Sequence, residues 1–134
     1  MNQKDEELVV MEYFRKNYPE FPAGRLIPSE SPDFILKINS KKSIGIELTR
    51  LDNMAKTLPE KIQSTLNNKN DKLRIYQNGK FQSIWLIIYA DFLEESKNFN
   101  IQNKMDNWRL SSQFDRVYLF ELFYKNILEL LIYS

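Results

Sequence analysis

Apolar positions follow helical spacing in three stretches of the chain. Residues 5–17 have apolar side chains at near-helical spacing, and three acidic residues stand at the start, where a helix dipole favours negative charge. Residues 58–76 show a second, intermittent apolar stripe, which the polar run at 67–71 frays or interrupts. Residues 101–113 predict a third and weaker helix around Ile101, Met105 and Trp108.

Strand-like patterns separate these predicted helices. Residues 25–27 predict a short strand. Residues 31–38 and 43–50 are rich in β-branched and large apolar residues, and the polar residues 39–42 between them are typical of a hairpin turn. Residues 83–90 form a continuous apolar run, which suits the centre of a sheet covered on both faces.

The C-terminal part of the chain is apolar and aromatic. Residues 114–123 predict another strand, whereas residues 126–133 are ambiguous between a strand and a short helix. The order of elements, with helices alternating with strands, predicts an α/β fold with a mixed central sheet flanked by helices. At 134 residues we expect one domain spanning residues 1–134.

Two acidic side chains, Asp33 and Glu47, interrupt the apolar segments of the predicted hairpin. If strand pairing is centred near Ser40, Asp33 lies opposite Glu47 on the same face of the sheet. Like charges placed opposite each other weaken a sheet, and buried carboxylates without a partner are costly. A divalent cation removes this conflict, because hard cations such as Mg²⁺ prefer oxygen ligands.

The composition excludes several classes of chemistry. The chain has neither cysteine nor histidine, so zinc–thiolate sites, cysteine nucleophiles, serine–histidine triads and histidine general bases are all excluded. The net charge of +1 neither supports nor opposes nucleic-acid binding. No apolar run approaches the ~18 residues of a membrane span, and the N-terminus lacks a signal-peptide pattern. We therefore expect a cytoplasmic protein that does not bind membranes.

The pair Pro32-Asp33 on one predicted strand, followed by Glu47-x-Thr49 on the next, resembles the PD-(D/E)XK nuclease superfamily. The resemblance covers roughly residues 5–90 and implies a restriction-endonuclease-like fold. It also implies a metal-dependent nuclease that acts on phosphodiester bonds of DNA or RNA. In that case Asp33, Glu47 and the backbone carbonyl of Leu48 would hold Mg²⁺ or Mn²⁺.

The chain departs from the superfamily pattern at Thr49, where a lysine usually stands. Threonine cannot supply the positive charge, although its hydroxyl could position a water molecule. The candidate substitutes are Lys37, which has the same strand parity as Asp33, and Lys61 or Gln63 on the following predicted helix, and we favour the helix residues. The superfamily often adds a glutamate from its first helix, and Glu12 is the best match, because Glu7 is expected to lie too far from the sheet.

A second interpretation stays open at this point. A nuclease-like scaffold that has lost its lysine would serve as a binding or regulatory module, with the acidic pair kept for structure or for weak metal binding. The aromatic run at residues 117–124 would then offer a homodimer surface, provided that it is not fully buried.

Overall fold

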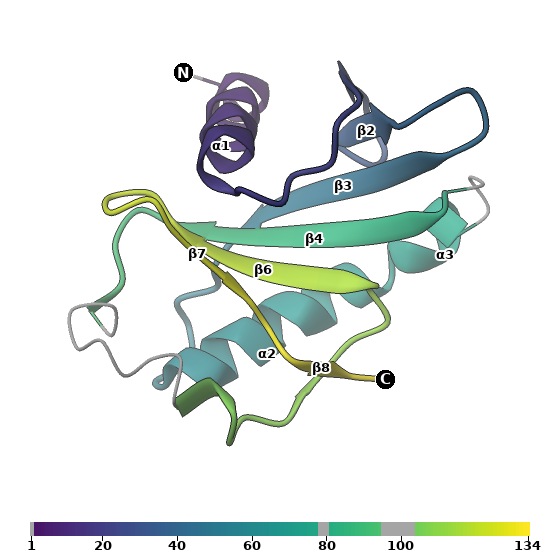
Figure 1. The fold of residues 1–134 in the computed structure, drawn as a ribbon. Helices are drawn as coiled ribbons and strands as arrows, with labels where there is room; N and C mark the ends of the chain where they lie inside the picture. Colours follow the sequence, from purple (N-terminus) through teal and green to yellow (C-terminus); the bar gives the residue numbers. More distant parts are fainter. Residues whose placement is uncertain (1, 78–80, 95–103) are drawn as a thin grey trace.

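The structure is a computed structural model that describes residues 2–77, 81–94 and 104–134 (Figure 1). Its centre is a mixed sheet of six strands in the order β1-β2-β3-β4-β6-β7. These strands are β1 (Arg25–Pro28), β2 (Phe34–Lys37), β3 (Ser43–Arg50), β4 (Ser83–Ala90), β6 (Arg116–Glu121) and β7 (Asn126–Glu129). Two short strands, β5 (Leu110–Ser111) and β8 (Ile132–Tyr133), pair with each other in parallel. The predicted α/β class with a mixed sheet is confirmed.

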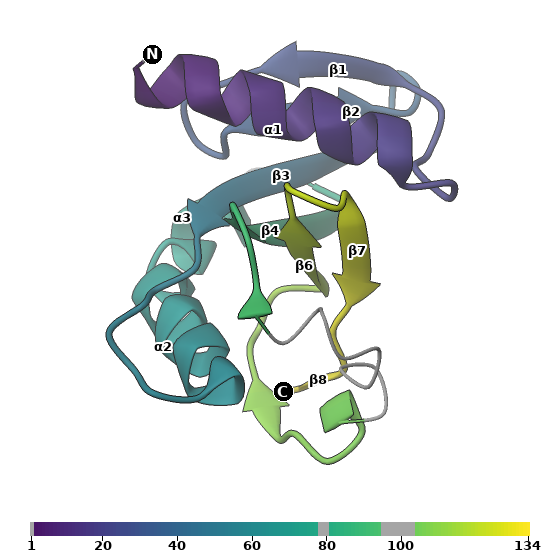
Figure 2. The ribbon, with the colours of Figure 1, turned by 90° about the vertical axis from the view of Figure 1, so that its left-hand side faces the viewer.

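Helices cover both faces of this sheet (Figures 1 and 2). The first helix, α1 (Gln3–Asn17), lies on one face, and α2 (Leu58–Asn70) with the short α3 (Leu73–Gln77) lies on the other. The side chains of Asn2 and Thr57 cap the first two helices by accepting hydrogen bonds from backbone amides three residues later. No helix within the described ranges is both long enough and apolar enough to cross a membrane.

The hairpin of β2 and β3 has the predicted register. Phe34 pairs with Ile46 and Ile35 with Gly45, so the pairing is centred on residue 40. Asp33 directly precedes β2 and therefore stands across the ladder from Glu47. The next strand, β4, runs parallel to β3, and the chain reaches it through α2 and α3, as expected for a helical crossover.

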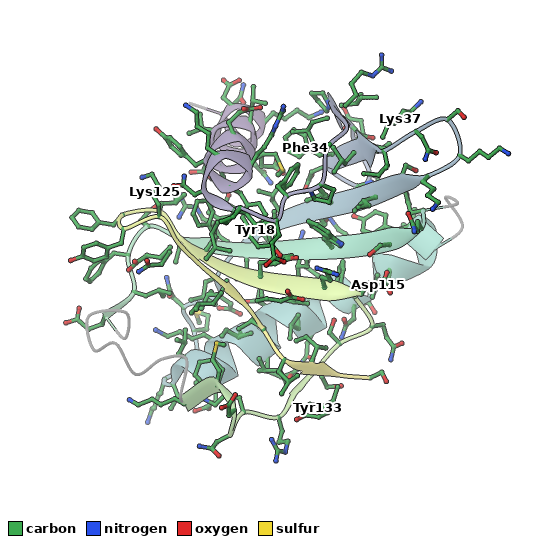
Figure 3. The ribbon with its side chains drawn as sticks, in the orientation of Figure 1. Tyr18, Phe34, Lys37, Asp115, Lys125 and Tyr133 are labelled. Carbon is green, nitrogen blue, oxygen red and sulfur yellow. The ribbon has the colours of Figure 1, made fainter. Side chains whose placement is uncertain are left out.

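The strand β4 is the centre of the core, between β3 and β6. All six residues at 84–89 are buried, which confirms the predicted central strand. Ile84, Leu86 and Ile88 pack toward α2, whereas Trp85, Ile87 and Tyr89 pack toward α1. Because both faces are covered, the strand needs no polar alternation. Tyr18, labelled in Figure 3, follows α1 and closes this side of the core, with its hydroxyl 3.1 Å from that of Tyr118.

The predicted helix at 101–113 is wrong over the part that the structure describes. Residues 101–103 lie outside the described ranges, only 104–105 are helical, and the chain then turns into β5. Met105 and Trp108 do contact the apolar cluster on the α2 side of the sheet. Their spacing therefore reflects tertiary packing, which periodicity along the sequence cannot distinguish from a helical stripe.

The ambiguous segment at 126–133 is resolved as two strands, β7 and β8. The aromatic run at 117–124 is buried as far as Glu121, in β6, but Phe123 and Tyr124 are exposed at the turn beside Lys125, which Figure 3 labels. Most of that run therefore belongs to the core, and its exposed part is restricted to one turn.

Candidate functional site

Asp33 and Glu47 are brought together by the hairpin, and backbone amides orient both carboxylates. The amide of Leu48 donates to Asp33 Oδ2 at 2.8 Å, and the amide of Asp33 donates to Glu47 Oε1 at 3.3 Å. Glu47 lies on the α2 side of β3, because its neighbours Ile46 and Leu48 pack toward α1. It is only 2% exposed.

Burial raises the pKa of both carboxyl groups above their ordinary values. For Glu47, the neighbouring Asp33 adds to the rise in pKa, and Lys69 and Tyr76 oppose it. For Asp33, the bond from Leu48 opposes the rise. A buried carboxylate this close to a half-buried one disfavours full ionisation of the pair unless a cation accompanies them.

The second and third helices supply positive and hydrogen-bonding partners to Glu47. Tyr76 donates its hydroxyl to Glu47 Oε2 at 2.9 Å, Lys69 Nζ lies 3.4 Å from the same oxygen, and Lys72 Nζ lies 3.8 Å from it. Burial, followed by the negative charge of Glu47, raises the pKa of Tyr76, so the phenol stays a donor. The break between α2 and α3, at residues 71–72, lets both helices reach the same carboxylate.

The first helix brings Glu7 rather than Glu12 to this site, which corrects the choice made from the sequence. The buried stripe of α1 consists of Glu7, Val10, Met11 and Phe14, and Glu12 is exposed. Glu7 is 8% exposed and lies close enough to Asp33 to raise the pKa of its carboxyl. The signal was available, because residues 7, 10, 11 and 14 have the spacing of one helix face.

An adjacent ion pair fixes the start of α1 against the sheet. Arg50 donates to both carboxylate oxygens of Glu6, at 2.6 and 3.3 Å, and Tyr89 donates its hydroxyl to Glu6 Oε2 at 2.9 Å. The guanidinium also lies 5.1 Å from the centroid of the Tyr89 ring. The bonds from Arg50 hold the pKa of Glu6 below its ordinary value. Because Glu7 is the next residue, this anchor also sets the direction of its side chain.

The two predicted helix substitutes for the missing lysine are placed elsewhere. Gln63 uses its amide to bond the backbone of Ser111, donating at 3.1 Å and accepting at 2.9 Å. Lys61 lines a separate cavity of about 400 Å³ beyond the ends of β3 and β4. Along the axis of α2, Lys61 lies about 12 Å from Lys69, so the two lysines cannot serve the same point. The residue from α2 that reaches Glu47 is Lys69, which follows the buried Ile62 by two helical turns.

Two cavities flank the acidic pair and share Glu7. One, of about 430 Å³, is lined by Thr49, Arg50 and Lys69 among others, and the half-buried Thr49 thus faces the same space as the lysine. The other, of about 330 Å³, is lined by Asp33 together with Lys4 and Glu30, which form an exposed ion pair. Asp33 therefore borders the second cavity directly, whereas Lys69 and Thr49 border the first.

No group of three or more histidine, cysteine, aspartate or glutamate side chains in the described ranges is arranged to hold a metal ion. Compared with family models, curated proteins and solved structures, the chain matches none. Any assignment of function must therefore rest on the geometry around Asp33 and Glu47.

Proposed function

We propose that the chain is a metal-dependent nuclease that hydrolyses phosphodiester bonds of DNA or RNA, with Mg²⁺ or Mn²⁺ held by Asp33 and Glu47. The observation that supports this proposal best is the approach of the half-buried Asp33 carboxylate to the buried Glu47 carboxylate across neighbouring backbone segments of the hairpin. The restriction-endonuclease-like fold belongs to the same proposal. It is supported by the element order, in which α1 precedes the β1-β2-β3 meander and the α2 crossover leads to a parallel β4.

The chemistry of the donor set suits a hard divalent cation. Burial raises the pKa of both carboxyl groups, and the neighbouring Asp33 raises that of Glu47 further, so a cation placed between them would stabilise their ionised forms. Oxygen is the donor type that Mg²⁺ and Mn²⁺ prefer. Glu7 is a third carboxylate near Asp33, but the three side chains do not form one metal-holding group, so the ion would rest on Asp33 and Glu47. The backbone carbonyl of Leu48 remains the further ligand that the resemblance implies.

Each residue has a separate task in this proposal. A divalent ion at such a site polarises a phosphoryl oxygen and lowers the pKa of bound water. The amide of Leu48 fixes Asp33, and the phenol of Tyr76 fixes Glu47. Lys69 would supply the positive charge that Thr49 lacks, close to where negative charge develops on the phosphate. The hydroxyl of Thr49 would help to position water from the wall of the cavity.

The test is a cleavage assay on labelled single-stranded and duplex DNA and RNA with Mg²⁺, with Mn²⁺, and with a chelator. We expect metal-dependent cleavage by the wild type and its loss in Asp33→Asn and Glu47→Gln. Glu129→Gln, which alters an exposed glutamate of β7, is the matched control and should cleave like the wild type. Cleavage that survives both site substitutions, or no cleavage of any substrate, would overturn the proposal.

One observation favours a second function, that of a binding or regulatory module. Glu47 Oε2 already has two lysines and a tyrosine as partners, which compensates much of its charge without a metal ion. Together with Thr49, this arrangement suits a site that no longer cleaves. Calorimetric titration with Mg²⁺ separates the two functions, because metal binding without cleavage of any substrate would favour the module.

A further inference from the structure

Lys69 occupies a position beside Glu47 that a divalent cation at the acidic pair would also require. Its ammonium lies 3.4 Å from Glu47 Oε2, its side chain is 19% exposed, and it also lines the cavity that contains Thr49. We propose that Lys69 is an exchangeable counter-ion, which leaves Glu47 when a divalent cation binds and then holds a tetrahedral oxyanion, such as a phosphate group, in that cavity. The inference rests on the proposed metal site and adds a coupling between metal and anion.

The exchange follows from the charges around one oxygen. Glu47 Oε2 accepts from Tyr76 and contacts the ammonium groups of Lys69 and Lys72. A divalent cation on the same carboxylate would repel an ammonium only a few ångströms away, by an amount that grows as the surroundings become less polar. The neutral phenol of Tyr76 suffers no such repulsion and can stay. Lysine has a long, flexible stem, so its charge can move while α2 keeps its place.

The cavity beside Thr49 is the available destination for the Lys69 ammonium. Its volume of about 430 Å³ falls in the range of small-ligand sites. Arg50 also lines it, but Glu6 holds that guanidinium through two hydrogen bonds, so its charge is already compensated. Glu6 and Glu7 also line this cavity, so an anion would have to lie at the wall formed by Thr49 and Lys69. Once it has left Glu47, Lys69 is the cation best able to meet an anion there. Lys72 is more exposed, at 52%, and lies farther from Glu47, at 3.8 Å.

The coupling must be reciprocal. If the metal ion frees Lys69 for an anion, then an anion that holds Lys69 must strengthen metal binding by the same factor. The structure thus predicts that Mg²⁺ and an oxyanion each bind more tightly when the other is present, and that this cooperativity depends on the ammonium of Lys69.

The experiment is isothermal titration of the full chain with Mg²⁺, with and without sulfate, which serves as a tetrahedral oxyanion that does not precipitate with magnesium. Wild type is compared with Lys69→Met, Lys69→Gln and Lys72→Met, and thermal unfolding verifies that each variant is folded. We expect Lys69→Met to bind Mg²⁺ about tenfold more tightly than the wild type, because the competing ammonium is gone. Sulfate should strengthen Mg²⁺ binding in the wild type and not in this variant.

The two lysines provide an internal comparison. Lys72→Met should change Mg²⁺ affinity by about twofold or less, since exposed ion pairs are weak. Lys69→Gln retains a hydrogen-bond donor without the charge and should behave like Lys69→Met. If Mg²⁺ binds the wild type but Lys69→Met binds it equally or less tightly, the exchange is refuted while the metal site stands. If Mg²⁺ binds neither protein, the metal site itself is refuted, and the exchange with it.

Discussion

Replacing both acidic residues, in the double variant Asp33→Asn/Glu47→Gln, should change how stability depends on pH in the absence of metal. Burial raises the pKa of both carboxyl groups in the folded chain. The folded state therefore keeps protons that the unfolded state releases once the pH exceeds the ordinary carboxyl range near 4. The stability that these groups provide is complete below that range and is lost as the pH rises through the raised pKa values. The amides do not titrate, so the variant lacks this loss.

The size of the effect follows from proton linkage. Each proton retained only by the folded state makes the free energy of unfolding fall by about 1.4 kcal/mol per pH unit within that window. Against this gain, the variant loses the charge partner of Lys69, and because this pair is mostly buried the loss costs more than it would for a surface ion pair. We expect this cost to lower the whole stability curve of the variant and to leave the difference in pH slope. Glu6 has a lowered pKa, which has the opposite effect on stability, but it is present in both proteins and cancels in their difference.

The assay is urea unfolding of the wild type, both single variants and the double variant between pH 4 and 8, in buffers with a chelator. We expect the free energy of unfolding of the double variant to rise steadily relative to that of the wild type as the pH rises. Mg²⁺ at about 100 times its dissociation constant should then add about 2.7 kcal/mol to the wild type and nothing to the double variant. Parallel stability curves for the two proteins across the whole pH range would refute the view that the two carboxyls repel each other in a buried site.

Three further predictions concern the surroundings of the site. Ile87→Asp places a charge in the middle of β4, at a position that is 0% exposed, and should lower the free energy of unfolding by about 4 kcal/mol or more, as measured by urea unfolding. The control is Phe123→Asp, at a position that is 67% exposed, which should change the free energy of unfolding little. Tyr89→Phe removes the hydroxyl bonded to Glu6 and should cost about 1 kcal/mol; a double-mutant cycle with Glu6→Gln should show that the two losses are not additive. Thr49→Lys should fold and should raise Mn²⁺-dependent cleavage of a labelled oligonucleotide; unfolding of this variant would show that the cavity wall cannot accommodate the longer side chain.

The parts of the fold that the sequence predicts well are those in which local pattern and tertiary packing agree. The turn at 39–42 determines the register of β2 and β3, and the uninterrupted apolar run at 83–90 can be buried only in the middle of a sheet. The helix prediction is wrong over residues 104–113 because local pattern and tertiary packing disagree there. It includes β5, whose partner is β8 near the C-terminus, and a pairing that distant leaves no mark in local periodicity.

The same distinction applies to the candidate site, where the strand residues could be predicted from the sequence and the helix residues could not. The facing of Asp33 and Glu47 follows from hairpin register, so it could be predicted without a structure. The helix residues that complete the site could not be predicted as easily, because each helix has several faces and the sequence does not state which face meets the strand. Glu7 and Lys69 both extend a stripe of buried residues, at the end of α1 and of α2 that lies nearest the acidic pair. A charged residue that continues an apolar stripe is the signal that would have identified them.

In the proposed nuclease site the positive charge comes from a helix and not from the strand, and the geometry explains how this can work. A lysine at position 49 would lie two residues beyond Glu47 on the same face of β3, about 7 Å along the strand. Lys69 approaches that same face from the helix layer above it, and its stem spans the gap to Glu47. Carboxylate ligands need exact backbone placement because their side chains are short, whereas an ammonium on four methylene groups can reach one point from several origins. The strand pair therefore constrains the acids tightly and the lysine loosely. A lysine on the helix has a freedom that one on the strand would lack, and the proposed exchange between the carboxylate and the cavity depends on that freedom.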